Sequence, residues 1–110
     1  MAKVYVTQYY CYFDYETASS FGTLVNLLDM GDEIYPDKVE SIGKAKSKIK
    51  EVFETRGGFN PLTDYLLMSG DPVLISAAVA EVIDGMGSER LPIKILKYSN
   101  VTKKYFVVEV

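Results

Sequence analysis

Residues 64–85 read Asp64-Tyr-Leu-Leu-Met-Ser-Gly-Asp-Pro-Val-Leu-Ile-Ser-Ala-Ala-Val-Ala-Glu-Val-Ile-Asp-Gly85 and predict a buried strand, a tight turn and a helix in quick succession. The strand, Tyr65–Ser69, is a short apolar run typical of a parallel sheet that is covered on both faces. Gly70 allows a sharp turn, Asp71 can cap the helix, and Pro72 suits a first helical turn, where its missing N–H has no partner. The stretch therefore predicts the centre of an α/β domain.

The N-terminal half supplies two more strands and one more helix. Lys3–Tyr12 is rich in valine, threonine and tyrosine and reads as a strand. Thr23–Leu28 is a second strand candidate, with a helix as the alternative. Apolar residues recur every three or four positions from Val39 to Phe53, which predicts an amphipathic helix that ends at Arg56-Gly57-Gly58.

The C-terminal segments complete the predicted sheet. Leu91–Tyr98 and Lys103–Val110 read as strands joined by a hairpin loop. A strand–helix–strand connection within one sheet is nearly always parallel, so the strands at Tyr65 and Leu91 should be neighbours. We expect a single α/β domain over residues 1–110, with a small Rossmann-like sheet of about five strands and two main helices. The predicted strand order is 2-1-3-4-5, mostly parallel with an antiparallel C-terminal edge strand.

The helix predicted over Pro72–Asp84 is apolar around most of its circumference, and three alanines make it slim. Such a helix is buried on more than one side. One side can face the sheet, and another can pack either on the first helix or on a second copy of the chain. A homodimer is therefore one of two interpretations of this helix.

Composition argues against several classes of partner. The formal net charge is −3, with 12 basic and 15 acidic residues, so no overall positive field attracts nucleic acid or an anionic membrane. The single cysteine, Cys11, excludes an intrachain disulfide and favours a reducing compartment, the cytosol. The sequence shows neither a signal peptide nor a membrane span.

Catalytic chemistry is poorly represented. The chain contains no histidine, the usual general base near neutral pH and a common metal ligand. We therefore expect a protein that is not an enzyme and that uses neither a cofactor nor a metal. A magnesium ion held by Asp14 and Asp71, at the ends of two neighbouring strands, is the alternative.

The turn after the central strand is the candidate ligand site. Ligands of open α/β sheets bind beyond the carboxyl ends of the strands, where helix N-termini offer free N–H groups. Ser69, Gly70 and Asp71 occupy that position, and Asp14 follows the first strand. A phosphate is disfavoured, because the turn has one glycine, an acidic cap and a proline. A structural turn and a site for a polar or cationic ligand both remain open.

Tyrosines mark the candidate protein interface. They are concentrated just after the first predicted strand, and two more lie in the C-terminal hairpin. Tyrosine gives contact area with little loss of rotamer entropy. Packing within the fold is the alternative, and base stacking is disfavoured because no basic residues accompany the aromatic run. The six residues are Tyr9, Tyr10, Tyr12, Tyr15, Tyr98 and Tyr105.

The sequence resembles a group of small α/β proteins encoded in tailed-bacteriophage genomes. The shared features are the Asp64-Tyr-Leu-Leu strand, the Gly70-Asp-Pro turn, the alanine-rich helix and the C-terminal Leu96-Lys-Tyr98 hairpin. Here Tyr98 stands where tryptophan is commoner. The resemblance implies a phage accessory protein, and many such proteins act by binding a host component.

Three hypotheses of function follow. The first is a non-enzymatic phage accessory protein that binds a host protein through its tyrosines. The second is a small-ligand protein that binds a nucleotide or signalling metabolite at Ser69–Pro72. The third is a component of the virion or of its assembly.

Overall fold

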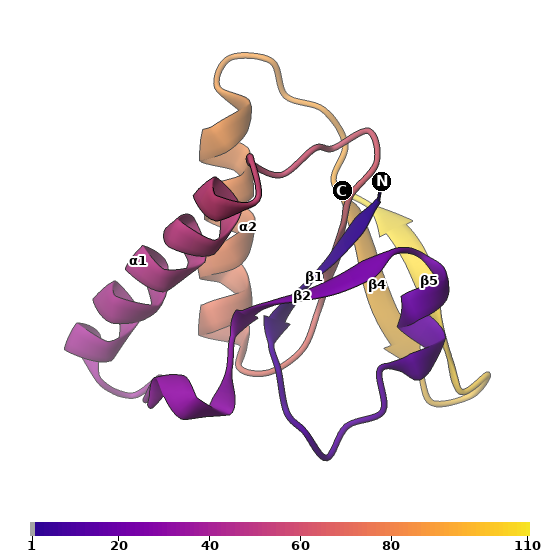
Figure 1. Cartoon of the computed structure of the whole chain (residues 1–110), viewed down its shortest axis with the longest axis horizontal. Helices are drawn as coiled ribbons and strands as arrows, with labels where there is room; N and C mark the ends of the chain where they lie inside the picture. The colour runs from indigo at the N-terminus through magenta and orange to yellow at the C-terminus, as the bar shows by residue number, and fades with distance from the viewer. Residues whose placement is uncertain (1) are drawn as a thin grey trace.

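The computed structural model describes residues 2–110, which form a five-stranded sheet with two α-helices on one face and a returning aromatic segment on the other (Figure 1). The strands are β1 (Lys3–Gln8), β2 (Thr23–Leu28), β3 (Tyr65–Leu67), β4 (Lys94–Ser99) and β5 (Lys104–Glu109). The helices are α1 (Val39–Thr55), α2 (Pro72–Met86) and the short 3₁₀ helices η1 (Glu16–Ser20) and η2 (Met30–Asp32).

The strand order is β2-β1-β3-β4-β5, as predicted. β1 pairs in parallel with β2 and β3, and β3 pairs in parallel with β4, whereas β5 runs antiparallel to β4. The predicted small, mostly parallel α/β sheet with an antiparallel C-terminal edge strand is confirmed. Thr23–Leu28 is a strand and not the alternative helix.

The helices cover one face of the sheet. Tyr5 in β1 and Leu66 in β3 point to this face and are fully buried. α1 contributes Ile49 and α2 contributes Leu74 to the same core. The two helices also pack on each other, and α2 contacts β1. The large apolar side chains of α2 that stay exposed are Val73 and Ile83.

No α-helix among residues 2–110 covers the other face. After β1 the chain turns back and lays Tyr15 and Ala18 of the following segment on Val4, Val6 and Leu96, and all of these residues are buried. Because β1 is covered on both faces, its apolar residues form a continuous run and do not alternate with polar ones.

Several elements differ in length from the prediction. β1 ends at Gln8, not Tyr12, because the chain turns at once and Phe13 N–H bonds to the carbonyl of Tyr10 at 3.1 Å. β3 ends at Leu67, and β4 begins only at Lys94. α2 runs to Met86 and is capped by Gly87, whose φ of 65° favours glycine, so the predicted last residue, Asp84, is two residues early. Neither α-helix is long and apolar enough to span a bilayer, as judged over residues 2–110.

Candidate functional site

The candidate site lies at the carboxyl edge of the sheet, where parallel strands end together. The loops that gather there are residues 9–15 after β1, 29–38 after β2, 68–71 after β3 and 99–103 after β4. This is the edge at which open α/β sheets bind their ligands. Two hollows lie along it, one on each side of the aromatic loop 9–15.

The first hollow, the aromatic pocket, has a volume of about 470 Å³. Five aromatic rings line it, together with one carboxylate, one amide and the turn after β3. Tyr12 is 68% exposed and Tyr98 is 39% exposed, so parts of both rings are free to meet a partner. The lining residues are Tyr12, Phe13, Asp14, Tyr15, Met68, Ser69, Gly70, Tyr98, Asn100 and Tyr105.

Buried hydrogen bonds hold the pocket wall to the sheet. The hydroxyl oxygen of Tyr15 lies 2.9 Å from Ser69 Oγ and accepts a hydrogen bond from Tyr10 N–H at 3.1 Å. The buried hydroxyl of Thr7, at the end of β1, accepts from Ser69 N–H at 2.9 Å and donates to the carbonyl of the same residue at 2.6 Å. The aromatic loop and the turn are therefore parts of one ordered wall.

The hairpin supplies the opposite wall. The rings of Tyr98 and Tyr105 meet at 67° with centroids 5.2 Å apart, an edge-to-face arrangement. Burial, with smaller contributions from Tyr15, Tyr98 and Asp14, raises the pKa of Tyr105 to about 12. Tyr105 is therefore a neutral phenol at physiological pH.

The second hollow, the acidic hollow, has a volume of about 460 Å³ and lies beside the N-terminus of α2. Asp29, Glu33 and Asp71 line it, so three carboxylates face a small space. Glu33 has a φ of 53°, which turns the chain sharply after η2. The other lining residues are Gln8, Tyr9, Tyr10, Met30, Ile34, Tyr35 and Pro36.

Two N–H groups at the start of α2 are used within the protein. Asp71 N–H donates to Gln8 Oε1 at 2.9 Å, and Val73 N–H donates to the Asp71 side chain at 2.8 Å, which makes Asp71 the predicted N-cap. Gly70 has a φ of +99°, and Gln8 lies where a Cβ atom would stand. An anion at this helix end would have to displace these internal partners.

All ten residues predicted as site residues line one of the two hollows. Asp14, Ser69 and Gly70 meet four of the interface tyrosines in the aromatic pocket: Tyr12, Tyr15, Tyr98 and Tyr105. Asp71, Tyr9 and Tyr10 line the acidic hollow. Tyr15 is buried, so its ring supports the wall and is not a free contact.

Sequence reasoning missed the loop after β2. Asp29, Glu33 and Tyr35 were not predicted as site residues, although they follow a strand whose carboxyl end lies beside that of β1. Their place after a parallel strand was the signal that could have found them. Phe13, which follows β1, and Asn100, which follows β4, were not predicted as site residues either.

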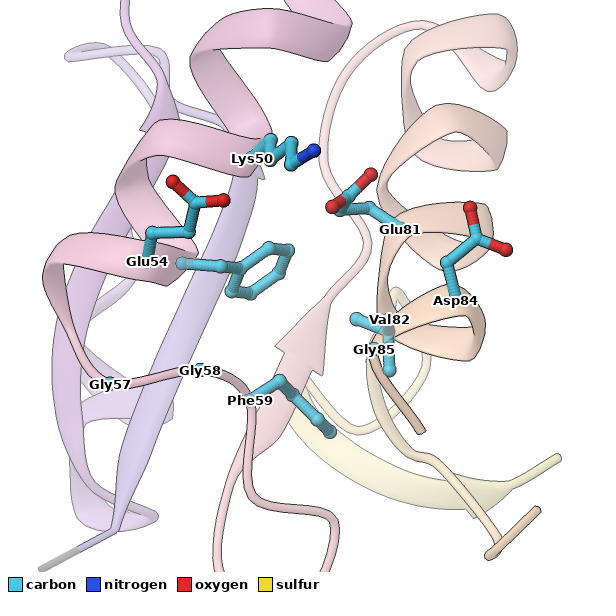
Figure 2. A pocket seen from close by; sticks show the side chains of 10 residues that line it. Lys50, Glu54, Gly57, Gly58, Phe59, Glu81, Val82, Asp84 and Gly85 are labelled. Atoms are coloured by element: carbon cyan, nitrogen blue, oxygen red, sulfur yellow. The ribbon is translucent and has the colours of Figure 1, made fainter. Parts of the chain in front are cut away.

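A further cavity, of about 700 Å³, lies elsewhere, between α1 and α2. Figure 2 shows Lys50 of α1 and Glu81 of α2 pointing toward one another across it, with Glu54 and Asp84 nearby. Phe53 also lines this cavity. None of the predicted site residues lines this cavity. Among residues 2–110, no group of three or more His, Cys, Asp or Glu side chains is placed to hold a metal ion.

Comparison with known proteins identifies a matching family. A family described as Phage Pam3 gp32-like protein matches residues 2–110. Neither the curated proteins nor the solved structures contain a match. The match confirms the predicted phage origin.

Proposed function

The chain belongs to the Phage Pam3 gp32-like protein family, and on this premise we propose that it is a non-enzymatic phage accessory protein that binds a host protein through the carboxyl edge of its sheet. It acts in the cytoplasm of the infected host. The observation that carries the proposal is the gathering of ordered, partly exposed aromatic side chains from two distant segments around one pocket.

The aromatic side chains have the properties of interface anchors. Tyr12, Phe13 and Tyr98 are each at least 39% exposed, yet each ring is held by a neighbouring aromatic ring. Pre-ordered tyrosines lose little entropy on binding and are enriched among the residues that dominate interface energies. The surface is therefore suited to protein recognition.

The charges of the same edge define the partner's chemistry. Asp14 stands at the aromatic pocket, and Asp29, Glu33 and Asp71 line the acidic hollow. A lysine or arginine side chain entering the aromatic pocket would meet ring faces and a carboxylate, an arrangement that stabilises a desolvated cation. We therefore propose that the host partner presents a basic segment.

A pull-down from host lysate tests the proposal. Tyr12→Ala combined with Tyr98→Ala should lower partner capture by about tenfold or more, the effect of losing one strong interface anchor. Leu62→Ala is the matched control, because Leu62 is 72% exposed and lies before β3, at the opposite edge. Equal capture by the double variant and the control would refute the aromatic surface as the binding site.

A small ligand in the aromatic pocket is the second candidate function. Its volume of about 470 Å³ falls within the usual range of small-molecule sites, roughly 300–1,000 Å³. Thermal-shift measurements with nucleotides, cyclic ones included, test this candidate: a ligand at 100 times its dissociation constant adds about 2.7 kcal/mol to the free energy of unfolding. A nucleotide-dependent shift that Tyr98→Ala abolishes would favour this function over host-protein binding.

A further inference from the structure

β5 is an edge strand that is apolar on both faces. Its outer side has no strand partner among residues 2–110. Phe106, Val107 and Val108 are consecutive and each is about two-fifths exposed, at 43%, 41% and 38%. Edge strands of soluble proteins are usually protected by proline, a bulge or charged side chains. β5 has one lysine at its start, Lys104, which follows Lys103 of the loop, and one glutamate at its end, Glu109.

The hydrogen-bond pattern shows which main-chain groups face outward. Ile93 and Val110 exchange two hydrogen bonds, of 2.9 and 3.0 Å. Such pairs alternate along an antiparallel ladder, so Val108 and Phe106 also point their N–H and C=O groups toward β4. The N–H and C=O groups of Tyr105, Val107 and Glu109 therefore point away from β4, toward the open edge.

The face of β5 on the helix side is also uncovered. Val108 lies opposite Ile95, which belongs to the core beneath the helices, so Phe106, Val108 and Val110 lie on that face. The helices lie over the other strands, as Figure 1 shows for α1 and α2 relative to β5. All three side chains are exposed by 38% or more. Among residues 2–110, the outer edge of β5 thus has no strand partner and this face has no α-helix over it, whereas η1 contacts β5 from the other face, where Ala18 and Tyr105 belong to one cluster.

We propose that β5 pairs antiparallel with β5 of a second copy of this chain, about a two-fold axis at Val107. In this register Val107 lies opposite Val107 of the second copy, and Tyr105 lies opposite Glu109. The outward N–H and C=O groups of these residues then bond to one another, two bonds for each opposed pair. The two five-stranded sheets join into one continuous sheet.

The strand matches itself in charge and in shape. Phe106 lies opposite Val108 of the second copy, an aromatic–β-branched pair that stabilises sheets. Lys104 lies opposite Val110, so no like charges oppose one another across the new pairing. A two-fold contact uses the same edge on both copies and closes at two subunits, so it covers β5 without forming a fibre.

This interface differs from the one that the sequence suggested. The homodimer predicted from α2 would use the outer side of that helix, where Val73 and Ile83 are the exposed large apolar residues. β5 offers a larger run of apolar side chains together with the free main-chain groups, which α2 lacks. The α2 interface is an alternative that the experiment distinguishes.

Sedimentation velocity on the purified full chain tests the proposal. The wild type should sediment as a dimer, and Val107→Lys, which opposes two lysines at the axis, should raise the dimer dissociation constant by about tenfold or more. Val101→Lys is the matched control, because Val101 is 92% exposed in the hairpin loop and gains the same charge. It should sediment like the wild type.

Cysteine cross-linking tests the register even if Val107→Lys folds poorly. In a Cys11→Ser background, Val107→Cys should form a dimeric disulfide under mild oxidation, since residues paired in this way lie about 5.5 Å apart at Cα. Val101→Cys should remain monomeric on a non-reducing gel. A monomeric wild type at about 0.1 mM would overturn the proposal, since a dissociation constant above that range is too weak for a stable dimer. A dimer that neither responds to Val107→Lys nor cross-links through position 107 would overturn it in favour of another surface, such as α2.

Discussion

The phenol oxygen of Tyr15 lies 2.9 Å from Ser69 Oγ, across 54 positions of sequence. This contact joins the aromatic loop after β1 to the turn between β3 and α2, which the sequence had presented as two separate candidates. It explains why interface tyrosines and candidate ligand residues line the same pocket.

Tyr15→Phe should lower the free energy of unfolding by about 1–2 kcal/mol, because it removes a buried hydrogen bond to Ser69 and leaves Tyr10 N–H without its acceptor. Urea denaturation measures the change. Tyr12→Phe is the control and should stay within about 0.5 kcal/mol of wild type, since Tyr12 is 68% exposed. Equal effects of the two variants would show that the hydrogen bond does not stabilise the loop.

Gly70→Ala should destabilise the protein by about 1–3 kcal/mol, because φ is +99° and the added Cβ would meet Gln8. Gly43→Ala is the matched control. Gly43 is exposed within α1, and no described atom lies near its added Cβ, so this variant should gain about 0.5–1 kcal/mol. Thermal or urea unfolding compares the two, and a neutral Gly70→Ala would mean that Gln8 moves aside readily.

Asp64→Asn should lower the free energy of unfolding by about 1–3 kcal/mol. The Asp64 carboxylate is buried and accepts hydrogen bonds from Lys3 N–H at 3.0 Å and Asn60 N–H at 2.8 Å. An amide has only one acceptor oxygen, so one N–H loses its partner. Asp37→Asn, outside this network, is the control for removal of a charge and should stay within about 0.5 kcal/mol of wild type in the same urea experiment.

Stability should fall as the pH rises from about 10 to about 12. Burial, reinforced by Asp64, raises the pKa of Tyr5 to about 12, and burial does the same for Tyr105. In this range the unfolded chain releases phenol protons that the folded state retains, so unfolding becomes more favourable with increasing pH. Phenolate absorbance and urea midpoints across the range measure the effect.

Tyr5→Phe separates the two tyrosines. The Tyr5 hydroxyl is buried and has no hydrogen-bond partner among residues 2–110. Removing it should leave stability near neutral pH unchanged or raise it by about 1 kcal/mol, since no bond is lost. In this variant, stability should also fall less steeply as the pH rises from about 10 to about 12. A clear loss of stability at neutral pH would show that a water molecule bonds this hydroxyl.

The strand order could be predicted because each element carries its own pattern and the rule for parallel connections restricts the arrangement. The end of β1 could not be predicted, because Tyr9–Tyr12 has the composition of a strand. The chain leaves the sheet there because Tyr15, farther along the loop, bonds to Ser69. The ten candidate residues could be predicted from the sequence, but not that residues from distant segments meet around the same pocket. Their meeting depends on contacts between segments about 60 residues apart, such as the hydrogen bond of Ser69 N–H to Thr7. No local sequence pattern predicts such contacts.

The open edge of β5 has a consequence for how strongly the protein binds its target. A two-fold axis through Val107 is perpendicular to the sheet, so it would keep the same face of both subunits on one side and place their two aromatic pockets at opposite ends of the joined sheet. Two pockets, each of modest affinity, would then bind a repeated or symmetric target together, because the second pocket binds at a high effective concentration once the first has bound. Valency, set by the outer edge of β5, would in that case determine the residence time of the complex.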